Sequence, residues 1–142
     1  MLRSALLTAV FAAGFVTAAS AATLQFHATM DGKSEVPPKQ TAGSGEALAT
    51  LDTTSKVLSY TLTFENLSGP AAAAHFHGPA KPGANAGVVV PIGGKDPTSP
   101  VHSTATLTDA QIKDLEAGMW YVNVHTAANP GGEIRGQVLP VK

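Results

Sequence analysis

The chain has 142 residues, with nine lysine and arginine residues against ten aspartate and glutamate residues, and it contains no cysteine. This balance, without a run of basic residues, gives no electrostatic support to a nucleic-acid partner or to an anionic membrane surface. The lack of cysteine excludes disulfides, so packing must stabilise the fold. Fourteen glycines and ten prolines favour short strands joined by tight turns.

The first 21 residues are expected to form a secretory signal peptide. Arg3 supplies the positive start, and residues 5–16 form an apolar stretch that is shorter than the roughly 20 residues needed to cross a bilayer. Ala19-Ser20-Ala21 fits a small-residue cleavage site. We expect cleavage after Ala21, which leaves residues 22–142 as one periplasmic or secreted domain with no membrane span.

Alternation of apolar and polar residues predicts β-strands along most of this domain. The pattern is clearest at residues 58–64, where every second residue is a leucine or an aromatic residue. A turn predicted at residues 52–55 joins this strand to the one before it as a hairpin. The predicted strands are residues 24–30, 46–51, 58–64, 71–77, 87–92, 101–107, 119–126 and 133–138.

One short helix interrupts the strands. Thr108 and Gln111 have the spacing of a capping box, and Gly118 fits the position just after a helix end. These signals predict a helix over residues 109–117. Eight short strands with one short helix predict an all-β fold, an antiparallel Greek-key-like sandwich or flattened barrel.

Three histidines point to a metal site. His75 and His77 lie two residues apart in a predicted strand, so their side chains share a face. His125 lies in another predicted strand that could neighbour the first. Three imidazoles with an open position suit Cu(II) or Zn(II), and the usual order of affinities favours copper. In the alternative interpretation, the three rings are structural and bond to the backbone or to each other.

Further polar residues are candidates for supporting roles. Asn123 shares the face of His125, and Glu133 could accept a hydrogen bond from a histidine N–H behind the metal. Arg135 could draw an anion toward the metal, although we favour a structural role in which it binds a carboxylate or turn carbonyls. His27 is the candidate for a fourth ligand, and His102 is expected to be exposed.

Several ordered motifs resemble the CHRD domain, which is named for chordin and also occurs in single-domain bacterial secreted proteins. This resemblance covers nearly all of residues 22–142 and implies an all-β extracellular module. The matching motifs are Glu35-Val36-Pro37-Pro38, His75-Phe76-His77-Gly78-Pro79, Leu107-Thr108 with Gly118, Tyr121-Val122-Asn123-Val124-His125-Thr126 and Gly131-Gly132-Glu133-Ile134-Arg135-Gly136-Gln137.

A weaker resemblance links the chain to copper/zinc superoxide dismutase. His75 and His77, then Val124-His125, then a glycine turn and Arg135 follow the order of copper ligands and nearby arginine in that fold. The bridging histidine, the zinc ligands expected in the loop of residues 79–86 and the disulfide cysteines have no counterparts. The resemblance therefore implies at most a mononuclear site.

Three functions remain open at this point. The first is an exported module that binds copper, or alternatively zinc, through His75, His77 and His125. The second is a non-catalytic envelope or extracellular protein-interaction module that uses strand edges and the loop of residues 79–85. The third is an enzyme of superoxide-dismutase type. The sequence contains no nucleophile elbow, phosphate loop or paired carboxylates, so catalytic residues stay unassigned and binding is preferred to catalysis.

Overall fold

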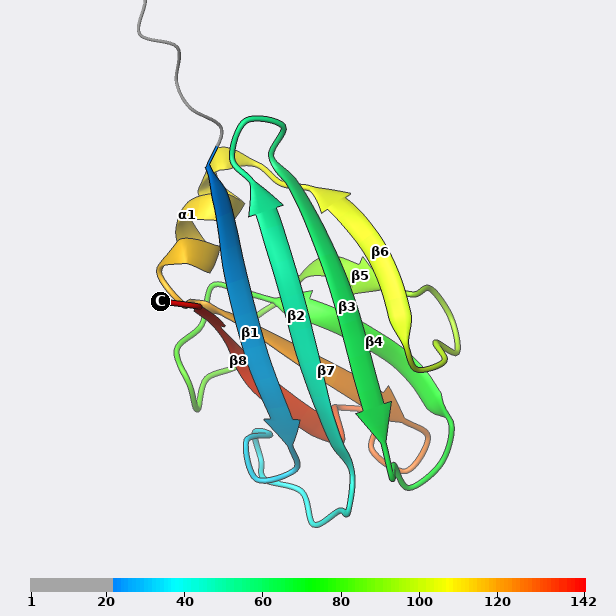
Figure 1. Cartoon of the computed structure of the whole chain (residues 1–142). Helices are drawn as coiled ribbons and strands as arrows, with labels where there is room; N and C mark the ends of the chain where they lie inside the picture. The colour runs from blue at the N-terminus through cyan, green and yellow to red at the C-terminus, as the bar shows by residue number, and fades with distance from the viewer. Residues whose placement is uncertain (1–21) are drawn as a thin grey trace, which may run out of the picture.

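The computed structural model describes residues 22–142, so the predicted signal peptide and its cleavage site, Ala19-Ser20-Ala21, lie outside the described residues. Within this range the chain forms eight strands and one helix (Figure 1). The elements are β1 (Thr23–Asp31), β2 (Ser44–Asp52), β3 (Val57–Glu65), β4 (Ala71–His77), β5 (Val88–Ile92), β6 (Val101–Thr106), α1 (Asp109–Glu116), β7 (Trp120–Thr126) and β8 (Ile134–Pro140).

The strands form one antiparallel sheet in the order β5-β4-β7-β8-β1-β2-β3-β6. The sheet folds over on itself, so that β1, β2, β3 and β6 lie in one layer and β4, β5, β7 and β8 lie in the other (Figure 1). The end strands β5 and β6 come into contact, which nearly closes the sandwich. The predicted all-β architecture is therefore confirmed.

The helix begins as its capping signals predict. The Thr108 hydroxyl accepts a hydrogen bond from the Gln111 amide at 3.2 Å, and the Gln111 side chain accepts one from the Thr108 amide at 2.9 Å. Helix α1 ends at Glu116, one residue earlier than predicted, and Gly118 adopts a φ of 69° after it. Leu115 is the buried residue that anchors α1 to the core.

The core lies between the two layers, and its side chains determine which residues of each strand face outward. Phe76 from β4 packs edge-on against Tyr60 from β3, with ring centroids 5.2 Å apart, and it also contacts Trp120 at the start of β7. Burial of each such side chain contributes roughly 1.5–3 kcal/mol. Because strand side chains alternate, burial of Phe76 and Val122 sends their neighbours to the outer face of β4 and β7.

Loops cover the part of that outer face around His77, Tyr121 and Asn123, while His75 and His125 stay partly exposed. Two connecting segments, residues 32–39 and 79–87, lie over it. The Tyr121 hydroxyl bonds to the backbone of Ala86 at 3.2 Å, and the Gln137 side chain donates to the Ala80 carbonyl at 2.8 Å. Tyr121 and Asn123 are each only 3% exposed. Loops therefore bury these two alternate residues of β7, although they lie on the face away from the core.

No helix in residues 22–142 is long and apolar enough to cross a membrane.

Candidate metal centre

The three predicted histidines meet on the outer face of β4 and β7. Each offers one ring nitrogen, and these three atoms lie within 4.8 Å of one another. Nδ1 of His75 and Nε2 of His125 are 3.0 Å apart. Two nitrogens at that distance, each bound at 2.0 Å to one ion, subtend an angle of about 97° at the metal. His75 and His125 therefore form a ready pair of adjacent ligands.

The strand register explains this convergence. His75 lies directly opposite Asn123 in the β4–β7 pairing, and His125 lies opposite Ala73. His75 and His125 are therefore diagonal neighbours on one face, a separation that aromatic side chains can bridge. His77 lies two residues further along β4 on the same face, and its ring centroid is 5.4 Å from that of His75.

Backbone carbonyls fix two of the rings. Nδ1 of His125 lies 2.9 Å from the Pro130 carbonyl oxygen, and Nδ1 of His77 lies 3.0 Å from the Ala86 carbonyl oxygen. A neutral His125 ring that donates from Nδ1 keeps the lone pair on Nε2 free for a metal, whereas the neutral His77 ring has one N–H for two acceptor oxygens, the Ala86 carbonyl and the side-chain oxygen of Asn123. Metal-binding histidines are commonly oriented by this kind of hydrogen bond. The donor set thus fits a metal ion.

The charge state of the rings also suits a metal. Burial lowers the pKa of the His75 ring, and the neighbouring His125 and His77 lower it further when they are charged. Burial also lowers the pKa of His77, although its bonds to Ala86 and Asn123 act in the opposite direction. Both rings are therefore neutral at neutral pH, which is the form that binds metals.

His77 is held more tightly than its two partners. Besides its bond to Ala86, its Nε2 lies 3.0 Å from the side-chain oxygen of Asn123. Its ring stacks on Tyr121, with centroids 4.7 Å apart and planes within 2° of parallel. The guanidinium of Arg135 covers the other face of Tyr121, 3.4 Å from the ring centroid. Three planar groups, from β4, β7 and β8, therefore form one stack.

Glu35 is a residue of this site that strand periodicity does not predict. It lies in the segment between β1 and β2, is only 3% exposed, and its Oε1 atom has no hydrogen-bond partner. Burial raises the pKa of this carboxyl, against the lowering effects of the Val36 backbone, Arg135 and Asn123. Its motif, Glu35-Val36-Pro37-Pro38, was the available signal, but nothing in it indicates burial.

Arg135 has the structural role that we favoured. It is 2% exposed, and its guanidinium donates to the Ala84 carbonyl and to the side-chain oxygen of Asn85. These bonds hold the 79–87 segment over the outer face. Because its donors are engaged in this way, the structure gives no support to Arg135 as a group that draws anions to the histidines.

Glu133 is bound by residues other than histidine. It is 0% exposed, and both its carboxylate oxygens accept short hydrogen bonds. Burial would raise its pKa, but these bonds outweigh burial and lower the pKa to about 2. The structure thus gives no support to Glu133 as an acceptor behind a metal ligand. The donors are the Thr41 hydroxyl, the Ser68 amide and hydroxyl, the Thr126 hydroxyl and the Asn129 side chain.

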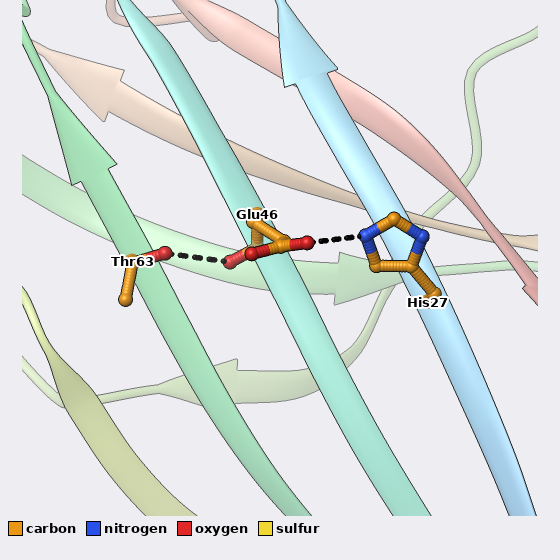
Figure 2. Close-up of polar contacts among 3 residues, drawn as sticks. All are labelled: His27, Glu46 and Thr63. Atoms are coloured by element: carbon orange, nitrogen blue, oxygen red, sulfur yellow. Dashed lines mark hydrogen bonds and ion pairs between the residues drawn. The ribbon is translucent and has the colours of Figure 1, made fainter.

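The two remaining histidines lie outside the cluster. Nε2 of His27 pairs with Glu46 at 2.7 Å across β1 and β2, near Thr63 of β3 (Figure 2). His102 on β6 is exposed and bonds to Thr61 at 2.9 Å. His27 is not in the group of potential ligands formed by His75, His77 and His125, so the structure does not support it as a fourth ligand.

The fold and this cluster define a β-sandwich domain with a candidate metal centre on the outer face of one layer. A family model for the CHRD domain matches residues 26–138, and the chain therefore belongs to the CHRD-domain family. The matched range holds every strand in part or whole and all three histidines. No curated protein and no solved structure matches the chain significantly.

Proposed function

We propose that this protein is an exported CHRD-domain module that binds a transition metal, copper in preference to zinc, through His75, His77 and His125. The observation that carries the proposal is the meeting of three ring nitrogens within 4.8 Å on two paired strands. Two backbone carbonyls that orient the rings support it further.

The choice of copper follows from the donor set. An all-nitrogen site without thiolate binds Cu(II) more tightly than the other divalent ions of the first transition series. Zinc is the alternative ion for the same ligands.

The proposal places the protein in the periplasm or outside the cell. A chain with a cleavable signal peptide leaves the cytosol. Expression in a secreting host, followed by mass determination of the exported protein, should give a mature chain that begins at Ala22. Retention of residues 1–21 on the exported protein would contradict this part of the proposal.

Titration with Cu(II), followed by electron paramagnetic resonance, tests the metal site. We expect one equivalent of copper with nitrogen hyperfine structure in the wild-type protein, and loss of that signal in a His75→Ala/His77→Ala variant. A His27→Ala/His102→Ala variant is the matched control, because it removes two histidines outside the cluster. An unchanged signal in the first variant, or no nitrogen-bound copper in the wild type, would overturn the proposal.

A protein-interaction role is the second candidate, and one surface favours it. Leu48 is 52% exposed on the outer face of the β1-β2-β3-β6 layer. It borders a shallow hollow of about 680 Å³, whose lining is rich in hydroxyl groups from β2, β3 and β6. Affinity capture from envelope extract with a Leu48→Glu variant as control tests this role, and equal recovery of partners by both proteins would count against it.

A dismutase activity is not part of the proposal, because the one cation expected to serve it, Arg135, is buried and bound to the 79–87 segment.

A further inference from the structure

The three candidate ligands are unequal in their present bonding. Nε2 of His125 and Nδ1 of His75 bond only to each other across 3.0 Å, so that one metal ion can take the place of the Nδ1 proton of His75 when that proton moves to Nε2 of the same ring. By contrast, Nε2 of His77 lies 3.0 Å from the side-chain oxygen of Asn123, so in this hydrogen bond Nε2 carries the proton of the ring and donates it to Asn123. A metal must therefore displace a protein group before it can reach His77.

Asn123 also has a second group within reach. The unpartnered Oε1 of Glu35 and the amide nitrogen of Asn123 would both come within 3 Å of a β-carbon placed on Gly132. A buried acceptor without a partner costs free energy. Movement of the amide nitrogen to within hydrogen-bond distance of Oε1 would satisfy that acceptor and withdraw the amide oxygen from His77. The ring proton of His77 can then move from Nε2 to Nδ1, where it donates to the Ala86 carbonyl and leaves Nε2 free.

Gly132 makes this arrangement possible. It adopts a φ of 124° and lies buried in the turn before β8, where the absence of a side chain leaves room for the Glu35 carboxyl and the Asn123 amide together. The three residues come from three separate parts of the chain, and they meet directly behind His77.

We propose that Asn123 is a positioning residue that competes with the metal for Nε2 of His77. The metal is captured first by His75 and His125, and it gains His77 as a third ligand when the amide of Asn123 turns to Glu35. This inference rests on the proposed metal-binding function and adds a regulated step to it.

Two substitutions on the same buried network should act in opposite directions. Asn123→Ala removes the competitor, so Cu(II) should bind about 3- to 10-fold more tightly, since one hydrogen bond no longer has to be broken. Glu35→Leu removes the alternative partner of the amide, so Cu(II) should bind more weakly by a similar factor. A purely structural role would weaken binding in both variants.

Isothermal titration of the full mature domain with Cu(II), together with the number of bound nitrogens from electron paramagnetic resonance, measures these effects. Gln25→Ala is the matched control, because it truncates an exposed amide side chain on β1, outside the histidine cluster. We expect its affinity to lie between those of the two test variants. If Asn123→Ala does not fold, Asn123→Thr shortens the side chain while keeping a residue suited to a strand.

The outcomes separate the two proposals. The inference is supported if Asn123→Ala binds copper more tightly than the wild type and through three nitrogens. This holds even if the wild type binds copper only weakly. Equal or weaker binding with an unchanged number of nitrogens overturns the role of Asn123 but leaves the metal site intact. Absence of nitrogen-bound copper from the wild type and from Asn123→Ala overturns both.

Discussion

Nδ1 of His75 and Nε2 of His125 face each other across 3.0 Å, although the two residues are 50 positions apart in the sequence. The contact joins β4 to β7 on the side of the sheet that faces away from the core. In a pair of neutral imidazoles one proton lies between these two nitrogens, and a metal ion can take its place when the proton of His75 moves from Nδ1 to Nε2. This pair is therefore the first place to test the site.

Loss of one ring of this pair should be costly for metal binding. His75→Ala should weaken Cu(II) binding by about 100-fold or more, since loss even of a supporting group behind a ligand typically costs 10- to 100-fold. Competition titration with a copper chelator measures the change. His102→Ala, which removes an exposed histidine on β6, should leave the affinity unchanged. Equal affinities of the two variants would contradict the assignment.

A change in the 79–87 segment, which covers the site, should weaken Cu(II) binding less than the loss of a ligand does, but by a measurable amount. Tyr121→Phe removes the hydroxyl that bonds to Ala86, the residue whose carbonyl orients His77. We expect a loss of about 1 kcal/mol of stability and a severalfold weaker affinity for Cu(II). Urea denaturation and copper titration give the two values. Tyr60→Phe, at the only other tyrosine in the sequence, controls for loss of a hydroxyl on the core side of β4, opposite the face of the histidines.

Two adjacent glycines provide a matched pair in the turn before β8. Gly132→Ala places a β-carbon within 3 Å of Glu35 and Asn123, at a φ of 124° that other residues rarely adopt. We expect it to destabilise the fold by about 2–3 kcal/mol. Gly131→Ala meets no atom within 4 Å and should change the unfolding free energy by less than about 0.5 kcal/mol. Similar melting temperatures for the two variants would show that the close packing behind His77 is not required.

The lowered pKa of Glu133 predicts how the stability of the fold changes in acid. Its pKa is held at about 2 in the folded protein, below the ordinary value of 4.5. A depressed pKa stabilises the folded state above the unfolded pKa, and this stability disappears as the pH falls from about 4.5 toward 2. The contribution is at most about 3 kcal/mol, because one pKa unit corresponds to about 1.4 kcal/mol.

Glu133→Gln should therefore be less stable than the wild type at pH 6 and approach it at pH 2. Denaturant titrations at a series of pH values measure the difference. Glu116→Gln, at the exposed end of α1, removes the same charge without a buried partner and should follow the wild type throughout. A constant difference between wild type and Glu133→Gln across this pH range would contradict the account.

Local signals in the sequence predicted the elements well, because each strand and the helix carry their own patterns. Alternation in β4 and β7 placed Phe76 in the core and the three histidines on the opposite face. The capping pair Thr108 and Gln111 marked the start of α1. The grouping of the histidines needed only that β4 and β7 be neighbours, which the structure now establishes.

The coverage of that face was not predictable in the same way. Glu35 and the 79–87 segment lie in connections without periodicity, and their contacts depend on the tertiary fold. The turn signals of such connections say where the chain bends but not which surface it covers. Likewise, the donors that bind Glu133 come from three separate connections and from the end of β7, so only the folded chain brings them together.

A crystal of the mature domain soaked with Cu(II), with an anomalous difference map recorded at the copper edge, tests the central claim most directly. The account predicts one strong peak bonded to Nδ1 of His75 and Nε2 of His125, with Nε2 of His77 as the third ligand. A map whose strongest peak lies at His27 or His102, or that shows no peak between β4 and β7, would contradict it.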